Sequence, residues 1–120
     1  MAVTNYGRQR MALWLGGSSS EYPSYFVIGS GSGVELATDT ALVYVEDKQI
    51  ITTADVSGAQ KVKWTVDWNS IEMSGLVLRE FGLTVSGAGN TGSVWSRTGM
   101  PAIIFDGTNE LRIEEIWEVY

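Results

Sequence analysis

The chain has 120 residues, of which 44% are hydrophobic and 18% charged, a balance typical of one globular domain that can build a core. Its formal net charge is −6 and its basic residues are scattered, so we expect neither nucleic acid nor an anionic membrane surface as a partner. The sequence has no Cys and no His, which excludes disulfides, thiol nucleophiles, zinc sites built from these residues and the commonest general base.

The N-terminal segment predicts a short helix. Residues Thr4–Leu15 carry an apolar face at helical spacing, Thr4 or Asn5 can cap the first turn, and Gly16-Gly17 ends the helix. Gly7 weakens it. We therefore expect residues 1–16 to form an N-terminal helix and arm on a single domain that spans residues 1–120.

Short strands and loops are expected next. Tyr25–Ile28 is a fully apolar strand that runs into the loop Gly29–Gly33. Thr38–Val45 is ambiguous, because its start can cap a helical turn while its end has the residues of a strand. Gln49–Val56 is predicted as one strand that ends in the turn Ser57-Gly58.

The clearest strand is Lys61–Trp68, in which polar and apolar residues alternate without a break. A turn at Asn69-Ser70 leads into a strand over Gly75–Val85. The Gly-rich tip Ser86–Gly92 then connects this strand to a returning strand at Val94–Thr98, which predicts a hairpin.

The C-terminal part continues the same pattern. A short apolar segment at Ile103–Phe105 is followed by a strong turn at Asp106–Asn109 and an alternating strand over Leu111–Val119. Six or seven strands at regular turn spacing, with one short leading helix, predict an all-β fold, an antiparallel β-sandwich.

Three motifs suggest chemistry, but each has a simpler structural interpretation. Gly29–Gly33 lacks the following helix and the Gly-Lys-Thr/Ser run of a phosphate loop, so a flexible loop is expected. Glu114-Glu115 and Glu118 resemble paired glycosidase carboxylates, but a solvated strand face or a bulge at Glu114-Glu115 is favoured. Asp106–Glu110 lacks the ligand spacing of a calcium loop. We expect no enzyme activity, no cofactor and no metal site.

The tryptophans leave one binding function open. Trp64 and Trp68 lie on the apolar face of their strand and are predicted to be in the core. Trp95, beside the Gly-rich tip, is the one candidate for an exposed platform that stacks on sugars. A carbohydrate-binding module in a host-recognition device is therefore an alternative function.

Arg79 and Glu80 interrupt an apolar strand. Alternation places them on opposite faces, so they need not pair with each other. Glu80 shares a face with Leu76, Leu78 and Gly82, which we expect to be buried, and there it can accept backbone N–H or Arg hydrogen bonds that fix the register of the strand. We predict Glu80 and Gly82 as structural anchors and expect Arg79 to face solvent or a neighbour.

Several segments form an ordered set of motifs: Asn5-Tyr6-Gly7-Arg8 through Leu15-Gly16-Gly17, Phe26–Gly31, Thr38–Leu42 with Glu46-Asp47-Lys48, Leu78–Leu83, and Ser96–Pro101 with Leu111–Tyr120. In this order the segments resemble a family of tailed-bacteriophage virion proteins, small β domains that attach tail and collar fibres to the particle. The chain departs from the family at its tip Ser86–Gly92, which is longer and richer in Gly than the usual short turn.

The resemblance implies a virion structural protein of the neck, collar or tail that docks a fibre or a neighbouring ring protein to the particle. Its expected partners are other virion proteins (portal, neck, tail or fibre chains) and further copies of itself, and its expected location is the virion. A capsid decoration protein is a further alternative. The candidate interface comprises Arg8, Arg10, Trp14, Arg79, Gly87, Asn90 and Trp95.

Overall fold

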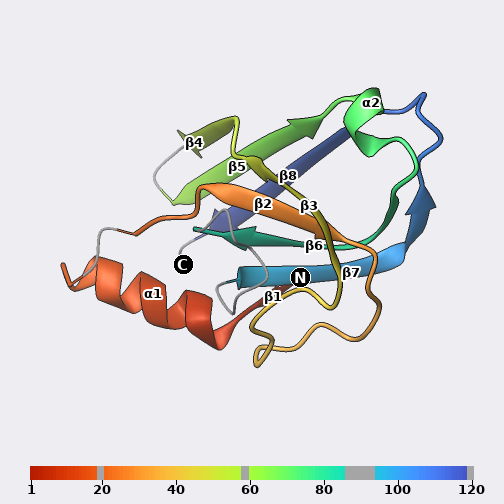
Figure 1. Cartoon of the computed structure of the whole chain (residues 1–120). Coiled ribbons are helices and arrows are strands. Elements are labelled where there is room, and N and C mark those ends of the chain that lie inside the picture. Colours follow the sequence, from red (N-terminus) through yellow and green to blue (C-terminus); the bar gives the residue numbers. More distant parts are fainter. Residues whose placement is uncertain (19–20, 58–59, 86–93, 119–120) are drawn as a thin grey trace.

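The computed structural model describes residues 1–18, 21–57, 60–85 and 94–118. Its elements are β1 (Ala2–Val3), α1 (Asn5–Leu15), β2 (Tyr25–Gly29), β3 (Val45–Ile50), β4 (Thr53–Ser57), β5 (Lys61–Trp68), α2 (Ser70–Met73), β6 (Val77–Thr84), β7 (Val94–Ile104) and β8 (Leu111–Glu118). The strands form a five-stranded sheet of order β1-β7-β6-β2-β3 and a three-stranded sheet of order β4-β5-β8. Figure 1 shows the two sheets as packed layers, with α1 beside the five-stranded one.

The predicted fold class is confirmed, since every strand pair is antiparallel and one short helix leads the two sheets. The described residues contain eight strands rather than six or seven, partly because Gln49–Val56 divides between the sheets as β3 and β4. The N–H of Ile51 donates to the carbonyl of Ser24 beside the five-stranded sheet, while the N–H of Thr52 donates to the carbonyl of Thr65 in the three-stranded sheet. The chain thus changes sheets between these two residues.

The main core lies between the two sheets. Trp64 and Trp68 on β5 are buried there, as predicted, together with Phe26, Leu83 and Ile113 from other strands. One side of the sandwich is closed where β3 approaches β5: the indole N–H of Trp68 donates to the carboxylate of Asp47 (3.1 Å), and the side-chain amide of Gln49 donates to the carbonyl of Asp67 (2.7 Å).

The other face of the five-stranded sheet is covered by residues 30–44, which we call the covering segment. Leu42 of this segment packs against Val27 of β2 and Val94 of β7 in a second apolar cluster. Phe26 and Ile28, the neighbours of Val27, point into the main core instead. Because β2 is buried on both faces, its sequence is apolar without alternation.

The covering segment and β7 differ from the sequence predictions. Within Thr38–Val45 no helix forms, and β3 begins only at its last residue. The N–H groups of Val43 and Tyr44 donate to a side chain, described below, instead of a neighbouring strand. The strand predicted at Val94–Thr98 continues to Ile104, so it includes most of the segment predicted separately as Ile103–Phe105.

Both helices are capped by side chains. Thr4 accepts the N–H of Gly7 (3.0 Å), and Gly16 follows α1 as its C-cap, as predicted. The short α2 replaces the turn predicted at Asn69-Ser70. Asn69 and Glu72 form a reciprocal capping box there, a pattern that is visible in the sequence.

Gly7 is buried because α1 lies directly against β7. A Cβ atom at this position would overlap the carbonyl oxygen of Trp95 and lie 2.9 Å from its Cα. Replacing Gly by Ala inside a helix ordinarily stabilises it by about 1 kcal/mol. Here we expect Gly7→Ala to lower the free energy of unfolding by about 1–3 kcal/mol, because the helix must shift from the sheet. Urea unfolding measures the effect, and Gln9→Ala, at an exposed position of the same helix, is the neutral control.

Candidate functional site

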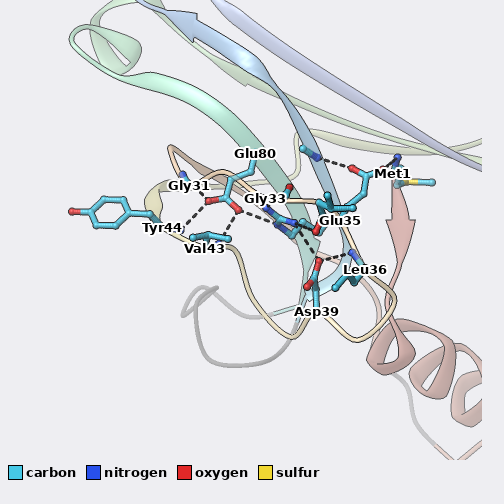
Figure 2. A network of polar contacts seen from close by, with 12 residues as sticks. Met1, Gly31, Gly33, Glu35, Leu36, Asp39, Val43, Tyr44 and Glu80 are labelled. Carbon is cyan, nitrogen blue, oxygen red and sulfur yellow. Dashed lines mark hydrogen bonds and ion pairs between the residues drawn. The ribbon is translucent and has the colours of Figure 1, made fainter.

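The side chain of Glu80 on β6 lies at the centre of a buried polar cluster beneath the covering segment. It is fully buried, and its carboxylate accepts the N–H groups of Gly31 (2.9 Å), Val43 (2.8 Å) and Tyr44 (2.8 Å). The Nε of Arg97 on β7 donates a fourth hydrogen bond (3.1 Å). Figure 2 shows the carboxylate of Glu80 pointing into the covering segment, toward Gly31, Val43 and Tyr44. One side chain therefore holds both ends of the segment to the sheet.

Arg97 extends the cluster along the same face. Its guanidinium is buried beside the carboxylates of Glu80 and Asp39, with 3.3 Å between Nη1 and Asp39. It also donates to the carbonyls of Val34 (3.2 Å) and Gly33 (3.4 Å). A buried guanidinium is stable only with such a full set of acceptors, so the cluster depends on every one of these contacts.

The close approach of the covering segment to Glu80 requires glycine at two positions. A Cβ on Gly29 would lie 2.8 Å from Oε2 of Glu80 and would overlap the carbonyl of Tyr44. A Cβ on Gly31 would overlap both Oε2 of Glu80 and the side chain of Val43. The Gly-x-Gly run is therefore packed against the cluster, and the prediction of a plain flexible loop is wrong for these two residues.

The alternation of β6 breaks just before Glu80. Leu76 and Leu78 pack in the main core, whereas Glu80 and Gly82 face the covering segment, where a Cβ on Gly82 would lie 3.2 Å from Leu42. The pairing register between β6 and β7 shifts between residues 78 and 80, which accounts for the change of face. The sequence prediction that all four residues share one buried face is therefore wrong for the two leucines.

A second carboxylate, that of Glu35, links the covering segment to β7 and to the N-terminus of the chain. Glu35 accepts the N–H of Gly99 (2.7 Å) and pairs with the N-terminal ammonium of Met1. The hydrogen bond from the ammonium, followed by that from Gly99, lowers the pKa of Glu35. The stabilisation from this lowered pKa is present above the ordinary pKa of the group and is lost as the pH falls through the lowered value.

A third carboxylate, that of Glu115 on β8, lies between the two sheets. It is buried, and its Oε2 accepts the hydroxyl of Ser96 (2.8 Å) and the indole N–H of Trp117 (2.7 Å). Its Oε1 has no hydrogen-bond partner among the described residues. Burial raises the pKa of Glu115 despite the two hydrogen bonds. The prediction of a solvated face is therefore wrong for Glu115, although it is confirmed for Glu114 and Glu118, which are exposed. The alternative of a bulge is wrong, because β8 pairs with β5 in one unbroken register.

Replacing Glu115 by Gln is expected to stabilise the fold near neutral pH. The amide oxygen can still accept from Ser96 and Trp117, and no charge is buried. Because the folded-state pKa is raised, the contribution of Glu115 to stability is complete below its ordinary pKa and is lost as the pH rises through the raised value. Urea unfolding should thus show an advantage of Glu115→Gln that shrinks as the pH falls. Glu114→Gln, at the exposed neighbouring position, is the control, and equal pH profiles for the two variants would contradict the prediction.

The helix α1 carries three of the predicted interface residues. Arg8 and Trp14 are exposed. Arg10 is partly buried, with its Nε 3.5 Å from the carboxylate of Glu21 and its guanidinium over the ring of Tyr6. Arg8 and Trp14 are thus accessible to a partner, whereas Arg10 is engaged within the chain.

The remaining interface candidates lie in different environments. Arg79 is exposed on β6, as expected. Trp95 is 4% exposed and packs against the ring of Trp117, with 6.2 Å between ring centroids, so the prediction of an exposed platform is wrong. Gly87 and Asn90 lie outside the described residues. Of the described candidates, Arg8, Trp14 and Arg79 are therefore exposed, whereas Trp95 is buried in the core.

The cluster around Glu80 can fix backbone in place, because the hydrogen bonds that Glu80 accepts all come from main-chain groups and from Arg97.

Residues 1–18, 21–57, 60–85 and 94–118 contain no group of three or more metal-ligating side chains. Within the same ranges no helix is long and apolar enough to cross a membrane. No protein-family model matches the chain, and no curated protein matches its sequence.

Sequence reasoning found Glu80 but missed Arg97, Asp39 and Glu115. Arg97 and Asp39 lie 17 and 41 positions from Glu80. The pairing of β6 with β7 brings Arg97 close to Glu80, and the path of the covering segment brings Asp39 to Arg97. For Glu115 the signal was present, since it has the same parity on β8 as the core residues Ile113 and Trp117.

Proposed function

We propose that this chain is a structural subunit of a tailed-bacteriophage particle, located at the neck, collar or tail, where it docks a fibre or a neighbouring ring protein. In this role the chain has no enzymatic activity and no cofactor. Its partners are other virion proteins and further copies of itself.

One observation supports the proposal most: the motifs that carry the family resemblance meet in space. The Leu-x-Glu-x-Gly-Leu strand supplies Glu80, the Gly-x-Gly loop supplies a backbone donor at Gly31, and the Thr-Asp-Thr segment supplies Asp39. The segment that begins at Ser96 supplies Arg97, which joins Glu80 to Asp39. Motifs that are weak separately thus form one stabilising cluster, as expected if they mark a shared fold for particle assembly.

The exposed apolar residues of the covering segment give this fold a surface for partners. Val34, Leu36, Val43 and Tyr44 are each more than half exposed. The backbone groups of Val43 and Tyr44 are held by Glu80, so their side chains are presented on a fixed frame. Rigid presentation of apolar side chains lowers the entropy cost of binding.

The experiment that tests the proposal is to locate the chain in assembled particles. Mass spectrometry of gradient-purified particles should detect its peptides, and electron cryo-microscopy should place its density at the neck, collar or tail. Density on the head lattice would instead identify a capsid decoration protein. Absence from purified particles, with the chain present in the infected lysate, would refute a virion role.

The burial of Trp95 removes the observation that favoured a carbohydrate-binding module.

A further inference from the structure

The two sides of the sandwich are closed in different ways. On one side, β3 is joined to β5 by the side-chain hydrogen bonds of Trp68 and Gln49 described above. On the other side β7 faces β8, and no backbone hydrogen bond joins these two strands within the described part of the chain. There the hydroxyl of Ser96 on β7 donates to the carboxylate of Glu115 on β8 (2.8 Å). We call this second side the β7–β8 side.

A bulge in β7 directs two consecutive side chains toward β8. The pairing of β6 with β7 passes from Ser96 to Val94, so Trp95 is an extra residue in β7. As a result, Trp95 and Ser96 both face the main core. Trp95 packs against the ring of Trp117 on β8, and Ser96 binds Glu115. These two contacts connect β7 to β8.

An apolar groove lies farther along the β7–β8 side, between β8 and the strands β6 and β7. It has a volume of about 220 Å³, and its apolar lining comprises Leu78, Phe81, Met100, Ile103, Leu111 and Ile113. Ile113 and Glu115 are consecutive residues on the same face of β8. Packing on this side is therefore interrupted next to Glu115, so the contacts of Glu115 and Trp117 hold the two strands together there.

No basic side chain balances the charge of Glu115. The chain has eight Lys and Arg residues, all of them within the described ranges, and none is paired with this carboxylate. From α1, Tyr6 packs against the main core, and Arg10 pairs with Glu21. The charged side chains of the strands around Glu115 lie on the opposite faces of their sheets: Lys61, Lys63 and Asp67 on β5, Glu80 on β6, Arg97 on β7, and Arg112, Glu114 and Glu118 on β8.

The surroundings of Glu115 thus favour its protonated form. One carboxylate oxygen, Oε1, is buried without a hydrogen-bond partner among the described residues. The N-terminal ammonium lowers the pKa of Glu115, but it is the weakest of the causes, and desolvation by burial is the strongest. Ionisation therefore places a charge without a counterion between the two sheets.

We propose that Glu115 controls the closure of the β7–β8 side by gaining or losing a proton: the protonated carboxyl keeps β7 and β8 together, and ionisation lets them separate locally. Separation brings water to the charged carboxylate without unfolding either sheet, because β8 keeps its pairing with β5 and β7 keeps its pairing with β6. This response is a local opening of the folded protein, distinct from its global unfolding.

The direction of the pH dependence follows from proton linkage. The closed form has a raised pKa at Glu115, whereas in the open form the carboxyl is in water and has its ordinary pKa. The open population is therefore constant below the ordinary pKa. It grows by up to about tenfold per pH unit between the two pKa values and levels off above the raised one.

Indole hydrogen exchange, followed by NMR, compares the two sides within one molecule. The indole N–H of Trp95 is buried at the β7–β8 side without a hydrogen-bond partner among the described residues, so it exchanges when that side opens. The indole N–H of Trp68 is bonded to Asp47 on the other side and is the internal control. The ratio of the two exchange rates, Trp95 to Trp68, cancels the dependence of the exchange chemistry on pH. We expect this ratio to rise with pH by up to about tenfold per unit and then level off.

Two variants assign the response to Glu115. Glu115→Gln should make the ratio independent of pH, because no proton is gained or lost. Glu114→Gln, at the exposed neighbouring position, should behave as the wild type. Ser96→Ala removes a hydrogen bond that lowers the pKa of Glu115, so it should move the rise to higher pH and tests the assignment should Glu115→Gln not fold.

A wild-type ratio that does not change with pH would overturn the proposal, as would a rise that persists in Glu115→Gln, is lost in Glu114→Gln, or stays at the same pH in Ser96→Ala. These measurements use the isolated chain and do not depend on whether the chain is found in particles.

Discussion

Glu80→Gln should lower the free energy of unfolding by about 3–5 kcal/mol. The substitution removes the charge that balances the buried guanidinium of Arg97, and the amide cannot accept all four hydrogen bonds that the carboxylate accepts. A domain of this size is stabilised by only about 5–15 kcal/mol, so the loss is a large part of the total. Equilibrium unfolding in urea, followed by tryptophan fluorescence, measures it.

Arg79→Gln is the matched control, because Arg79 precedes Glu80 on the same strand but is exposed. This control should change the free energy of unfolding by no more than about 0.5 kcal/mol. If Glu80→Gln is as stable as the control, the carboxylate does not anchor the covering segment.

Gly31→Ala should destabilise the fold by about 3 kcal/mol, at the upper end of the usual cost of overpacking. The added methyl group would overlap the Glu80 carboxylate and the Val43 side chain, and would lie 2.7 Å from the backbone nitrogen of Tyr44. The segment would have to move away from the sheet and lengthen its hydrogen bonds to Glu80. Thermal and urea unfolding both report the change.

Ser32→Ala adds no atom to the cluster and changes an exposed residue next to Gly31, so it should be close to neutral. The combination of Gly31→Ala with Glu80→Ala provides a second check. Part of the overlap disappears with the carboxylate, so the double variant should lose less free energy of unfolding than the two single variants lose in sum. Strict additivity would mean that Gly31 and Glu80 do not act together.

The strands that could be predicted from the sequence are those in which one face is buried and turn residues stand at both ends. β5 is the clearest case, because Trp64 and Trp68 alternate with polar residues over its whole length. The sequence predicted one strand where the structure has β3 and β4, because nothing in the local pattern of residues marks a change of sheet. That change is determined by hydrogen bonds from Ile51 and Thr52 to partners distant in the sequence.

The candidate site was predictable only at its centre. A carboxylate in an apolar strand indicates burial with partners, and Glu80 follows this rule. Its main partner, Arg97, follows a Gly-rich tip and has no local feature that distinguishes it from a surface residue. The prediction that Trp95 is exposed was wrong for the same reason, because its burial depends on packing against Trp117 across the sandwich.

The covering segment also constrains the order in which the chain can fold during synthesis. Gly31, Val43 and Tyr44 are synthesised before Glu80, and Arg97 is synthesised later still. Until β6 and β7 are both available, the N-terminal third has neither the acceptor for these amides nor the central strands on which β1 and β2 pair. We therefore expect the domain to form after translation of its last strands, in a single cooperative event dominated by distant contacts.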